Sequence, residues 1–386
     1  MIIDADYNSP NSRIIGFDGS RAFVKDRTGT ENYSFQLLKA LSGLDYKNQY
    51  MVYLRSSTQE DVLRGWPDTF QFKHIHWFRF WTQGGLAIQT FKDDLDVLFV
   101  SAHTLPLVRK GGLKTVITVH DLGSEYLPSM HQLKQRLYLS YIQKYQLKTA
   151  TKIIAVSKAT KEDLVKKVGI KAEKISVVYE GYNQKLYKPV KDDILIDSLR
   201  GYGLKRGKYF LFVGTIQPRK NLERVIKAFS AHLEGVKAHL RGGLKLAIVG
   251  AKGWLSDGIY RLPQKLGIED RVKFLGYVPE KDLPALYSGA IALLFPSLFE
   301  GFGLPILEAQ ACGCPVITSN TSSMPEIAGK GAILVDPYSV DDIVRGIREI
   351  GEVGVRQRLI KAGFENIKRF SWEKCARETL KVIMSS

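Results

Sequence analysis

The stretch Phe299-Glu300-Gly301-Phe302-Gly303-Leu304-Pro305-Ile306-Leu307-Glu308 places two carboxylates around a glycine-rich turn. Pro305 suits the first position of a helix, because its missing N–H would be unpaired there in any case. The N–H groups at such a helix start, together with the helix dipole, attract anions. We expect Glu300 on the loop before the helix and Glu308 in its first turn. Two carboxylate acceptors beside an anion-binding turn suit a sugar attached to a nucleotide diphosphate.

The length and composition of the chain limit what it can be. Its 386 residues, 45% hydrophobic and 25% charged, are more than one ordinary core holds, so we expect two soluble domains. No apolar run approaches the roughly 20 residues of a membrane-spanning helix, and the first residues show no signal-peptide pattern. The three cysteines, Cys312, Cys314 and Cys375, make neither a disulfide framework nor a zinc ligand set. We therefore expect a protein of the reducing cytoplasm.

The formal net charge of +17 calls for an anionic partner or a solvated basic surface. Nucleic acid, an anionic membrane and polyphosphate ligands are the candidate partners. Aromatic and basic residues mix at 76–81, and 134–148 is predicted to be a basic helix, a combination that is found at anionic lipid interfaces. Aromatic residues at such spacings also occur in protein cores. Among the functional explanations we favour the inner face of a membrane.

Both halves of the chain alternate apolar strands with amphipathic helices, which predicts two doubly wound α/β domains. Strands are predicted at 13–18, 49–54, 97–101, 115–120, 152–156 and 175–179 in the first half, and at 209–214, 245–249, 272–275, 292–295 and 315–318 in the second. A loop at 28–31 is expected to precede the first helix. Two such domains bind ligands at the carboxyl ends of their strands, in a cleft between them.

A second cluster of candidate residues follows the strand that ends at Gly214. Here Arg219 and Lys220 precede a predicted helix, with Asn221 as its N-cap. Arginine can hold a diphosphate by bidentate contact and lysine as a point charge. Alone, such a pair would be ordinary solvated surface. Together with the glutamate turn in the same half of the chain, it predicts a phosphate site.

Three weaker signals lie at other strand ends. His120 and Asp121 follow the predicted strand 115–120, so the histidine can face the cleft and contact a sugar or a developing charge. A capping or core histidine is the alternative, and His103 is a lesser candidate. The glycine of the 28–31 loop allows a ligand to approach the backbone closely. Residues 274–279 can supply backbone hydrogen bonds and an apolar wall for a nucleotide base, or be a plain loop.

Jointly these residues resemble the retaining glycosyltransferases of family four, also called group 1, with two facing Rossmann-like domains and a deep cleft (the GT-B fold). The resemblance covers almost the whole chain. It is most specific at Gly214-Thr215, Arg219-Lys220-Asn221, Phe274-Leu275-Gly276, Pro296-Ser297, Glu300-Gly301-Phe302-Gly303-Leu304-Pro305, Glu308-Ala309, Pro315-Val316-Ile317 and Pro325-Glu326. One departure is Glu180-Gly181, where the family more often has Asn-Gly.

The mixed charge, the proline and the glycines of the region before residue 207 predict a linker at 187–206. The resemblance implies an acceptor-side domain at 1–186, a nucleotide-sugar domain at 207–365, and a helix at 366–386 that crosses back to the first domain. It implies catalytic roles for His120, Glu300, Arg219 and Lys220, with no metal and no cofactor. The implied donor-binding residues are Gly214, Arg219, Lys220, Tyr277, Val278, Glu300, Phe302, Gly303, Leu304 and Glu308, with Glu308 on the ribose and Glu300 by the sugar. Thr28, Gly29 and Thr30 form the implied acceptor-side loop.

The implied activity is transfer of a hexose from a nucleotide diphosphate sugar with retention of configuration. The Thr215–Asn221 segment resembles the mannosyltransferase-like branch, which favours GDP-mannose over a UDP-hexose. A glycan or lipid-linked oligosaccharide is the expected acceptor, in polysaccharide biosynthesis of the cell envelope. An epimerase would instead release nucleotide diphosphate without an acceptor, and a phosphorylase lacks a recognisable pyridoxal lysine. A nucleic-acid-binding protein would explain the charge, but no known binding module supports it.

Overall fold

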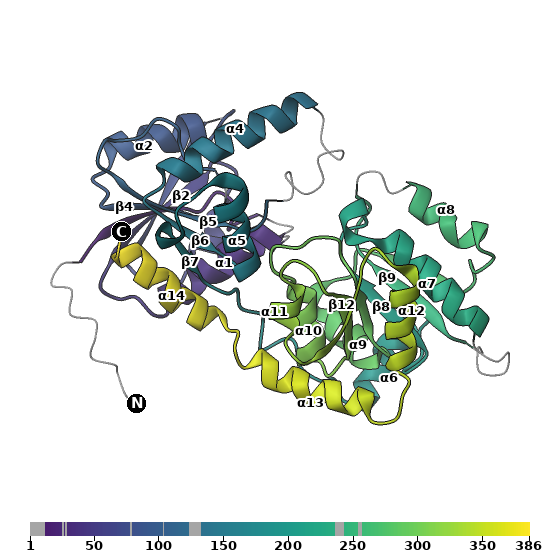
Figure 1. Cartoon of the computed structure of the whole chain (residues 1–386). Helices are drawn as coiled ribbons and strands as arrows, with labels where there is room; N and C mark the ends of the chain where they lie inside the picture. Colours follow the sequence, from purple (N-terminus) through teal and green to yellow (C-terminus); the bar gives the residue numbers. More distant parts are fainter. Residues whose placement is uncertain are drawn as a thin grey trace. The chain divides into compact units, whose positions relative to one another are not determined.

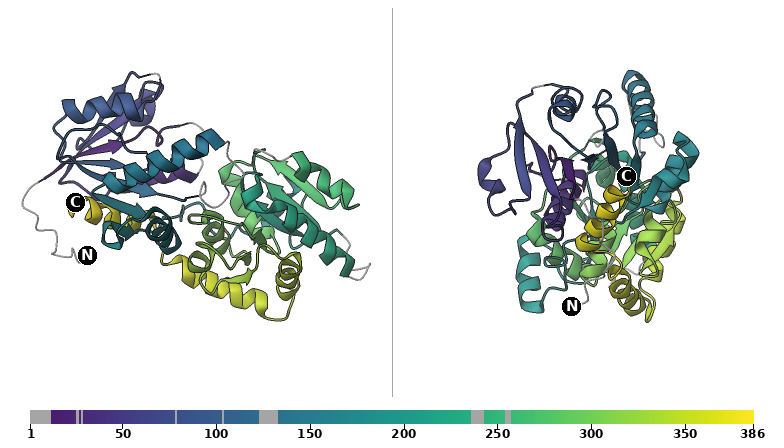
Figure 2. Two further views of the ribbon diagram at one scale, coloured as in Figure 1. Left: turned by 45° about the horizontal axis from the view of Figure 1, so that its top comes forward. Right: turned by 90° about the vertical axis from the view of Figure 1, so that its left-hand side faces the viewer.

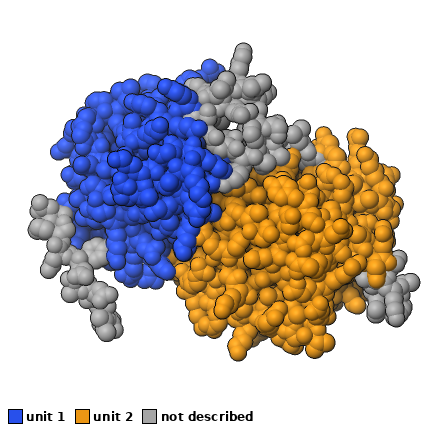
Figure 3. Space-filling model, in the orientation of Figure 1, with its two compact units in different colours: residues 1–181, 372–386 blue, residues 182–371 orange. Residues whose placement is uncertain are grey.

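The structure, a computed structural model, describes residues 12–24, 27, 29–77, 79–102, 104–122, 133–235, 243–253 and 257–386, with only the backbone described at 133–140. The chain divides into two compact units (Figure 3). Unit 1 comprises Met1–Gly181 and Trp372–Ser386, and unit 2 comprises Tyr182–Ser371. Within the described residues, no helix is both long enough and apolar enough to cross a membrane.

Unit 1 is built on a seven-stranded parallel sheet with the order β3-β2-β1-β4-β5-β6-β7. Figures 1 and 2 show helices on both sides of this sheet. Its elements are β1 (Ile14–Asp18), α1 (Gly29–Ser42), β2 (Gln49–Arg55), η1 (Glu60–Leu63), β3 (Phe70–Ile75), η2 (Thr82–Leu86), α2 (Ala87–Lys92), β4 (Val97–Val100), β5 (Lys114–Val119), α4 (Leu133–Thr149), β6 (Lys152–Ala155), α5 (Lys158–Asp163), η4 (Leu164–Val168), η5 (Ala172–Lys174), β7 (Ile175–Val177) and α14 (Trp372–Met384).

The central strand β4 of unit 1 is apolar throughout because both faces of the sheet are covered. All four residues of β4 are buried, as expected for a parallel strand with helices on each face. The last helix of the chain, α14, packs against α1 and β6 and so belongs to this unit. It buries Trp372, Cys375 and Ile383 there.

Unit 2 contains a six-stranded parallel sheet with the order β10-β9-β8-β11-β12-β13. Its elements are α6 (Asp192–Gly201), β8 (Tyr209–Val213), η6 (Pro218–Lys220), α7 (Leu222–Gly235), β9 (Lys245–Val249), α8 (Asp257–Lys265), β10 (Val272–Gly276), η7 (Glu280–Asp282), α9 (Leu283–Gly289), β11 (Leu293–Phe295), α10 (Leu304–Ala311), β12 (Val316–Ser319), α11 (Met324–Ala328), β13 (Ala332–Val335), α12 (Val340–Glu349) and α13 (Val355–Ile367). One core joins Phe212, Ile248 and Leu294 of the sheet to Phe229 of α7 and Ile347 of α12.

The predicted doubly wound α/β class is confirmed in both units, but some predicted details differ. The sequence analysis missed β3 and β13, which are edge strands. Residues 187–206, suggested as a linker, lie in unit 2 and contain α6, which buries Leu195 and Leu199. The loop expected at 28–31 is also shorter, because α1 already begins at Gly29.

Candidate active site at the switch point of unit 2

The order of the strands in unit 2 reverses between β8 and β11. From β8 the chain winds outward through β9 and β10, and from β11 it winds the opposite way through β12 and β13. In open α/β sheets the loops on either side of such a reversal separate at the carboxyl ends of the strands and leave a crevice for ligands. The loops here are 214–221 after β8 and 296–303 after β11, the two segments that the sequence analysis selected.

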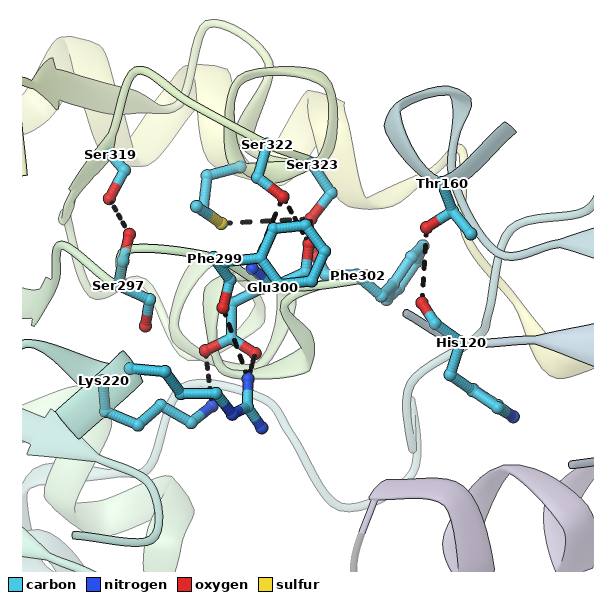
Figure 4. Close-up of polar contacts among 12 residues, drawn as sticks. His120, Thr160, Lys220, Ser297, Phe299, Glu300, Phe302, Ser319, Ser322 and Ser323 are labelled. Atoms are coloured by element: carbon cyan, nitrogen blue, oxygen red, sulfur yellow. Dashed lines mark hydrogen bonds and ion pairs between the residues drawn. The ribbon is translucent and has the colours of Figure 1, made fainter. Parts of the chain in front are cut away.

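Glu300 lies between two basic side chains of the opposite loop. Lys220 Nζ donates to Glu300 Oε1 at 2.5 Å, and Arg219 Nη1 donates to Glu300 Oε2 at 2.7 Å (Figure 4 shows the Lys220 contact). Glu300 and Lys220 are only 7% and 8% exposed, whereas Arg219 is half-buried. The structure therefore brings three predicted catalytic residues together, with the carboxylate as the partner of both cations.

In this cluster the neighbouring positive charges together affect the pKa of Glu300 more strongly than burial does. Burial alone would raise the pKa of Glu300, but the positive charges of Lys220 and Arg219, with the hydrogen bond from Lys220, lower its pKa to about 2. Glu300 is therefore ionised at neutral pH and balances one of the two cations. The cluster keeps an excess positive charge, which a diphosphate can neutralise.

Two serines after β12 fix the backbone of the Glu300 loop. Ser322 Oγ donates to the Glu300 carbonyl at 2.6 Å, and Ser323 Oγ donates to the Phe302 carbonyl at 2.7 Å (Figure 4). Ser322 has a φ of +56°, an unusual conformation for a residue other than glycine. Such strained residues concentrate at functional sites. The sequence analysis missed both serines, although their place after a strand end next to β11 could have indicated them.

Asn221 joins the two loops instead of capping α7 with its side chain. Its Nδ2 donates to the carbonyls of Pro296 and Pro337 at 2.9 and 2.6 Å. Its φ is +61°, so it is a second non-glycine residue in the left-handed region at this site. The main-chain carbonyl of Asn221 accepts from the N–H groups of Arg224 and Val225 at the start of α7. The predicted N-cap side chain thus holds the switch-point loops together.

Helix α10 begins at Leu304, directly after Gly303 and one residue before Pro305, which was predicted to be its first residue. The φ of Gly303 is +114°, which side chains rarely permit, and Pro305 occupies the first turn. The first N–H groups of any α-helix lack intrahelical partners, so this end of α10 can bind an anion. The prediction for Glu308 needs correction: α10 has no acidic residue in its first turn, and Glu308 is the fifth residue of the helix.

The other predicted donor-binding residues of unit 2 occupy different environments. Gly214 follows β8 with a φ of +151°, a conformation that residues with side chains rarely adopt, and it lies next to the Lys220 side chain. Tyr277 and Val278 follow β10. Tyr277 is 74% exposed, whereas Val278 is buried, so of the two only the tyrosine ring is open to a ligand.

His120 lies in unit 1, immediately after β5, and both of its ring nitrogens have partners there. Nδ1 lies 3.2 Å from Glu180 Oε1, and Nε2 donates to the Ser101 carbonyl at 3.0 Å. Burial opposes protonation, but the hydrogen bond and charge of Glu180, with the Ser101 carbonyl, raise the pKa of His120 above its usual value. The sequence analysis noted Glu180 only as a departure from the family pattern. Sugar binding by the ring requires one of these contacts to open.

The predicted acceptor-side residues lie at the start of α1. Gly29 is exposed and Thr30 is partly exposed in the first turn, whereas Thr28 lies outside the described residues, as does His103. A β-carbon at position 29 would have no described atom within 4 Å apart from those of its chain neighbours and its own helix backbone. The fold itself therefore does not require a glycine at this position. In the parts of the chain that the structure describes, no three His, Cys, Asp or Glu side chains could together hold a metal ion.

Comparison with known proteins assigns both halves of the chain. Residues 200–366 match the family model "Glycosyl transferases group 1", and residues 27–186 match "Glycosyltransferase Family 4". The chain is 32% identical over 268 residues to O-antigen chain mannosyltransferase B of Escherichia coli, which is 69% of each protein. It is 27% identical to O-antigen chain mannosyltransferase RfbU of Salmonella typhimurium, over 89% of this chain and 95% of that one.

A solved structure also has this architecture. HepE of Anabaena, solved in complex with UDP and glucose, matches with a TM-score of 0.73 and 18% identity over 97% of this chain and 100% of that one. At this identity the match supports the GT-B fold alone, in agreement with the two parallel-sheet units.

Proposed function

Because this chain belongs to the group 1 glycosyl transferases of glycosyltransferase family 4, we propose that it transfers mannose from GDP-mannose with retention of anomeric configuration. A UDP-hexose is the second choice of donor. The proposed acceptor is a hydroxyl of a glycan or lipid-linked oligosaccharide in polysaccharide biosynthesis of the cell envelope. The names of the two O-antigen relatives support the choice of mannose.

The observation that carries this proposal is the position of Lys220, Arg219 and Glu300 at the switch point, beside the start of α10. Two cations and a helix N-terminus can stabilise a diphosphate as its charge grows during departure. Groups placed in advance around a developing charge are commonly worth about 3 kcal/mol each. In this proposal they perform the task that a metal ion has in other sugar transfer reactions, so no metal and no cofactor is needed.

In this proposal each of the remaining residues contacts a different part of the donor. Glu308 holds the ribose, Tyr277 lies beside the base, and the backbone around Phe302, Gly303 and Leu304 binds phosphate and sugar hydroxyls. Glu300 contacts the sugar once the diphosphate has taken over its cations. From unit 1, His120 meets the donor sugar after one of its ring contacts opens, and the α1 start at Gly29 and Thr30 receives the acceptor.

Thermal unfolding with a panel of nucleotide sugars tests the proposed donor. A ligand that binds only the native state stabilises it by mass action and so raises Tm. At a ligand concentration of 100 times Kd, the free energy of unfolding rises by about 2.7 kcal/mol. We expect GDP-mannose to raise Tm more than UDP-glucose or UDP-galactose. In a separate transfer assay, the protein should move mannose from GDP-mannose to a membrane-derived glycan extract. If no nucleotide sugar raised Tm, the proposed function would be wrong. Hydrolysis or epimerisation without any acceptor would favour the epimerase.

An anionic membrane surface is the proposed partner of unit 1, at the inner face of the membrane. Trp77 and Phe80 are 44% and 75% exposed, and on α4 Tyr141 and Tyr145 are 79% and 52% exposed beside basic residues. Exposed aromatic side chains with lysines are typical of anionic lipid interfaces. We expect flotation with phosphatidylglycerol vesicles at low salt, weakened by Phe80→Ser. Absence of flotation in the wild-type protein would remove the membrane from the proposal.

A further inference from the structure

The carboxylate of Glu308 is contacted by two buried tyrosines from other parts of unit 2. The Tyr287 hydroxyl, on α9, donates to Glu308 Oε2 at 2.8 Å. Tyr187, in the segment before α6, lies close to the same carboxylate. The two tyrosine rings pack against each other, with centroids 6.2 Å apart and an interplanar angle of 66°. Tyr287 is fully buried and Tyr187 is 4% exposed, whereas Glu308 itself remains partly exposed.

Both tyrosine hydroxyls act as fixed hydrogen-bond donors. Burial and the neighbouring Glu308 charge raise the pKa of each hydroxyl well above its usual value, so both stay protonated at any working pH. An ionised carboxylate has about four acceptor positions. The Tyr287 hydroxyl, with Tyr187 packed beside it, can therefore hold Glu308 in one orientation and still leave acceptor positions for the hydroxyls of a ligand.

The same contacts control the charge of Glu308. Burial, together with the negative charge of Glu280 in η7, raises its pKa. The hydrogen bond from Tyr287 and the nearby Tyr187 hydroxyl lower it, and the net pKa is about 7. The Cys312 thiol, just after α10, also faces this group, but burial raises its pKa so far that it stays neutral. Near neutral pH, the tyrosines therefore influence what fraction of Glu308 is ionised.

We infer that Tyr287, supported by Tyr187, is a positioning residue that orients the Glu308 carboxylate toward the ribose hydroxyls of the donor. This inference rests on the proposed function, in which Glu308 accepts hydrogen bonds from the ribose. Tyr287 itself does not contact the donor. It acts by fixing one carboxylate oxygen and by favouring the ionised form, which is the better acceptor for two neighbouring hydroxyls.

The variant Tyr287→Phe tests this role, because it keeps the ring and removes the hydroxyl. A nucleotide sugar is the probe, since a free nucleoside diphosphate would itself titrate near pH 6. If the pKa of Glu308 rises by about one unit, its ionised fraction at pH 7 falls from about half to about a tenth, so KM for GDP-mannose should rise about fivefold with little change in kcat. The fall of kcat/KM at low pH should begin about one pH unit higher. Near pH 9, where Glu308 is ionised in both proteins, the increase in KM should shrink to the part that lost orientation causes.

Tyr202→Phe is the matched control, because the Tyr202 hydroxyl donates to another carboxylate of unit 2, Asp282 Oδ2, at 2.7 Å. It should leave KM and its pH profile unchanged. If Tyr287→Phe does not fold, Tyr187→Phe should give the same direction of shift. A wild-type pH profile in either folded tyrosine variant would overturn the positioning role, as would a wild-type KM at pH 7 in folded Tyr287→Phe. If the wild-type protein bound no nucleotide sugar, the proposed function itself would be wrong.

Discussion

Lys220→Ala should lower kcat/KM for sugar transfer by about a hundredfold to a thousandfold, the usual effect of removing one group that stabilises a developing charge. Lys220 supplies one of the two cations at the switch point of unit 2, where a departing diphosphate would gain charge. Initial rates with GDP-mannose, or with whichever donor the panel selects, measure the loss. Arg219 still pairs with Glu300 in the variant, so the protein should fold.

Lys227→Ala is the matched control for this prediction. Lys227 lies on α7, in the same unit, and pairs with the exposed Glu223 one helical turn away. Its removal should leave transfer unchanged, because exposed ion pairs contribute little. If folded Lys220→Ala transferred sugar at nearly the wild-type rate, Lys220 would have no role at the leaving group.

Glu300→Gln should destabilise the protein by about 3 kcal/mol at neutral pH, because it leaves two cations adjacent and without their carboxylate. The size follows from the pKa of Glu300, which falls from its ordinary 4.5 to about 2 in the folded protein. Each unit of pKa difference between the unfolded and folded states corresponds to about 1.4 kcal/mol. Urea denaturation of both proteins measures the difference.

The pH dependence of this loss has a definite sign. The folded-state pKa of Glu300 is depressed, so its stabilising contribution is complete above pH 4.5 and disappears as the pH falls toward 2. The stability gap between the wild-type protein and Glu300→Gln should therefore be widest near neutral pH and narrow below pH 4.5. Pyrophosphate should reduce the gap, since it supplies the missing negative charge.

The exposed residue Glu223 provides the control. Glu223→Gln also removes one carboxylate from an ion pair with a lysine, but at the surface. It should change stability by less than about 0.5 kcal/mol at any pH. A gap between wild type and Glu300→Gln that stayed constant from pH 7 to pH 3 would contradict the buried ion-pair account.

The features that were predicted well are those that a local sequence pattern indicates. The buried strands of both sheets are continuous apolar runs, and the start of α10 at Gly303-Leu304-Pro305 combines a glycine with a proline. The two missed strands, β3 and β13, are edges of their sheets. An edge strand has a neighbour on one side only and tolerates polar residues, and in β3 Lys73 and His74 weaken the apolar pattern. This reason applies to β3 only, because β13 is a short apolar run.

The partners of the candidate residues could not be predicted in the same way. Glu300 pairs with cations 80 and 81 positions away. Such contacts depend on which strands become neighbours, and no local pattern records that. Tyr187 was missed because it lies in the segment that the sequence suggested as a linker, and Tyr287 because it lies on another helix, 21 positions before Glu308. The strand-end rule and the family resemblance both indicated His120, whereas its Glu180 partner follows from the pairing of β5, β6 and β7.

The position of the donor in a crystal of the protein grown with GDP-mannose tests the central claim most directly. The account predicts the diphosphate against Lys220 and Arg219 at the start of α10, and the ribose hydroxyls on the Glu308 carboxylate. A nucleotide sugar bound elsewhere on unit 2, with Glu300 still paired to both cations, would contradict it.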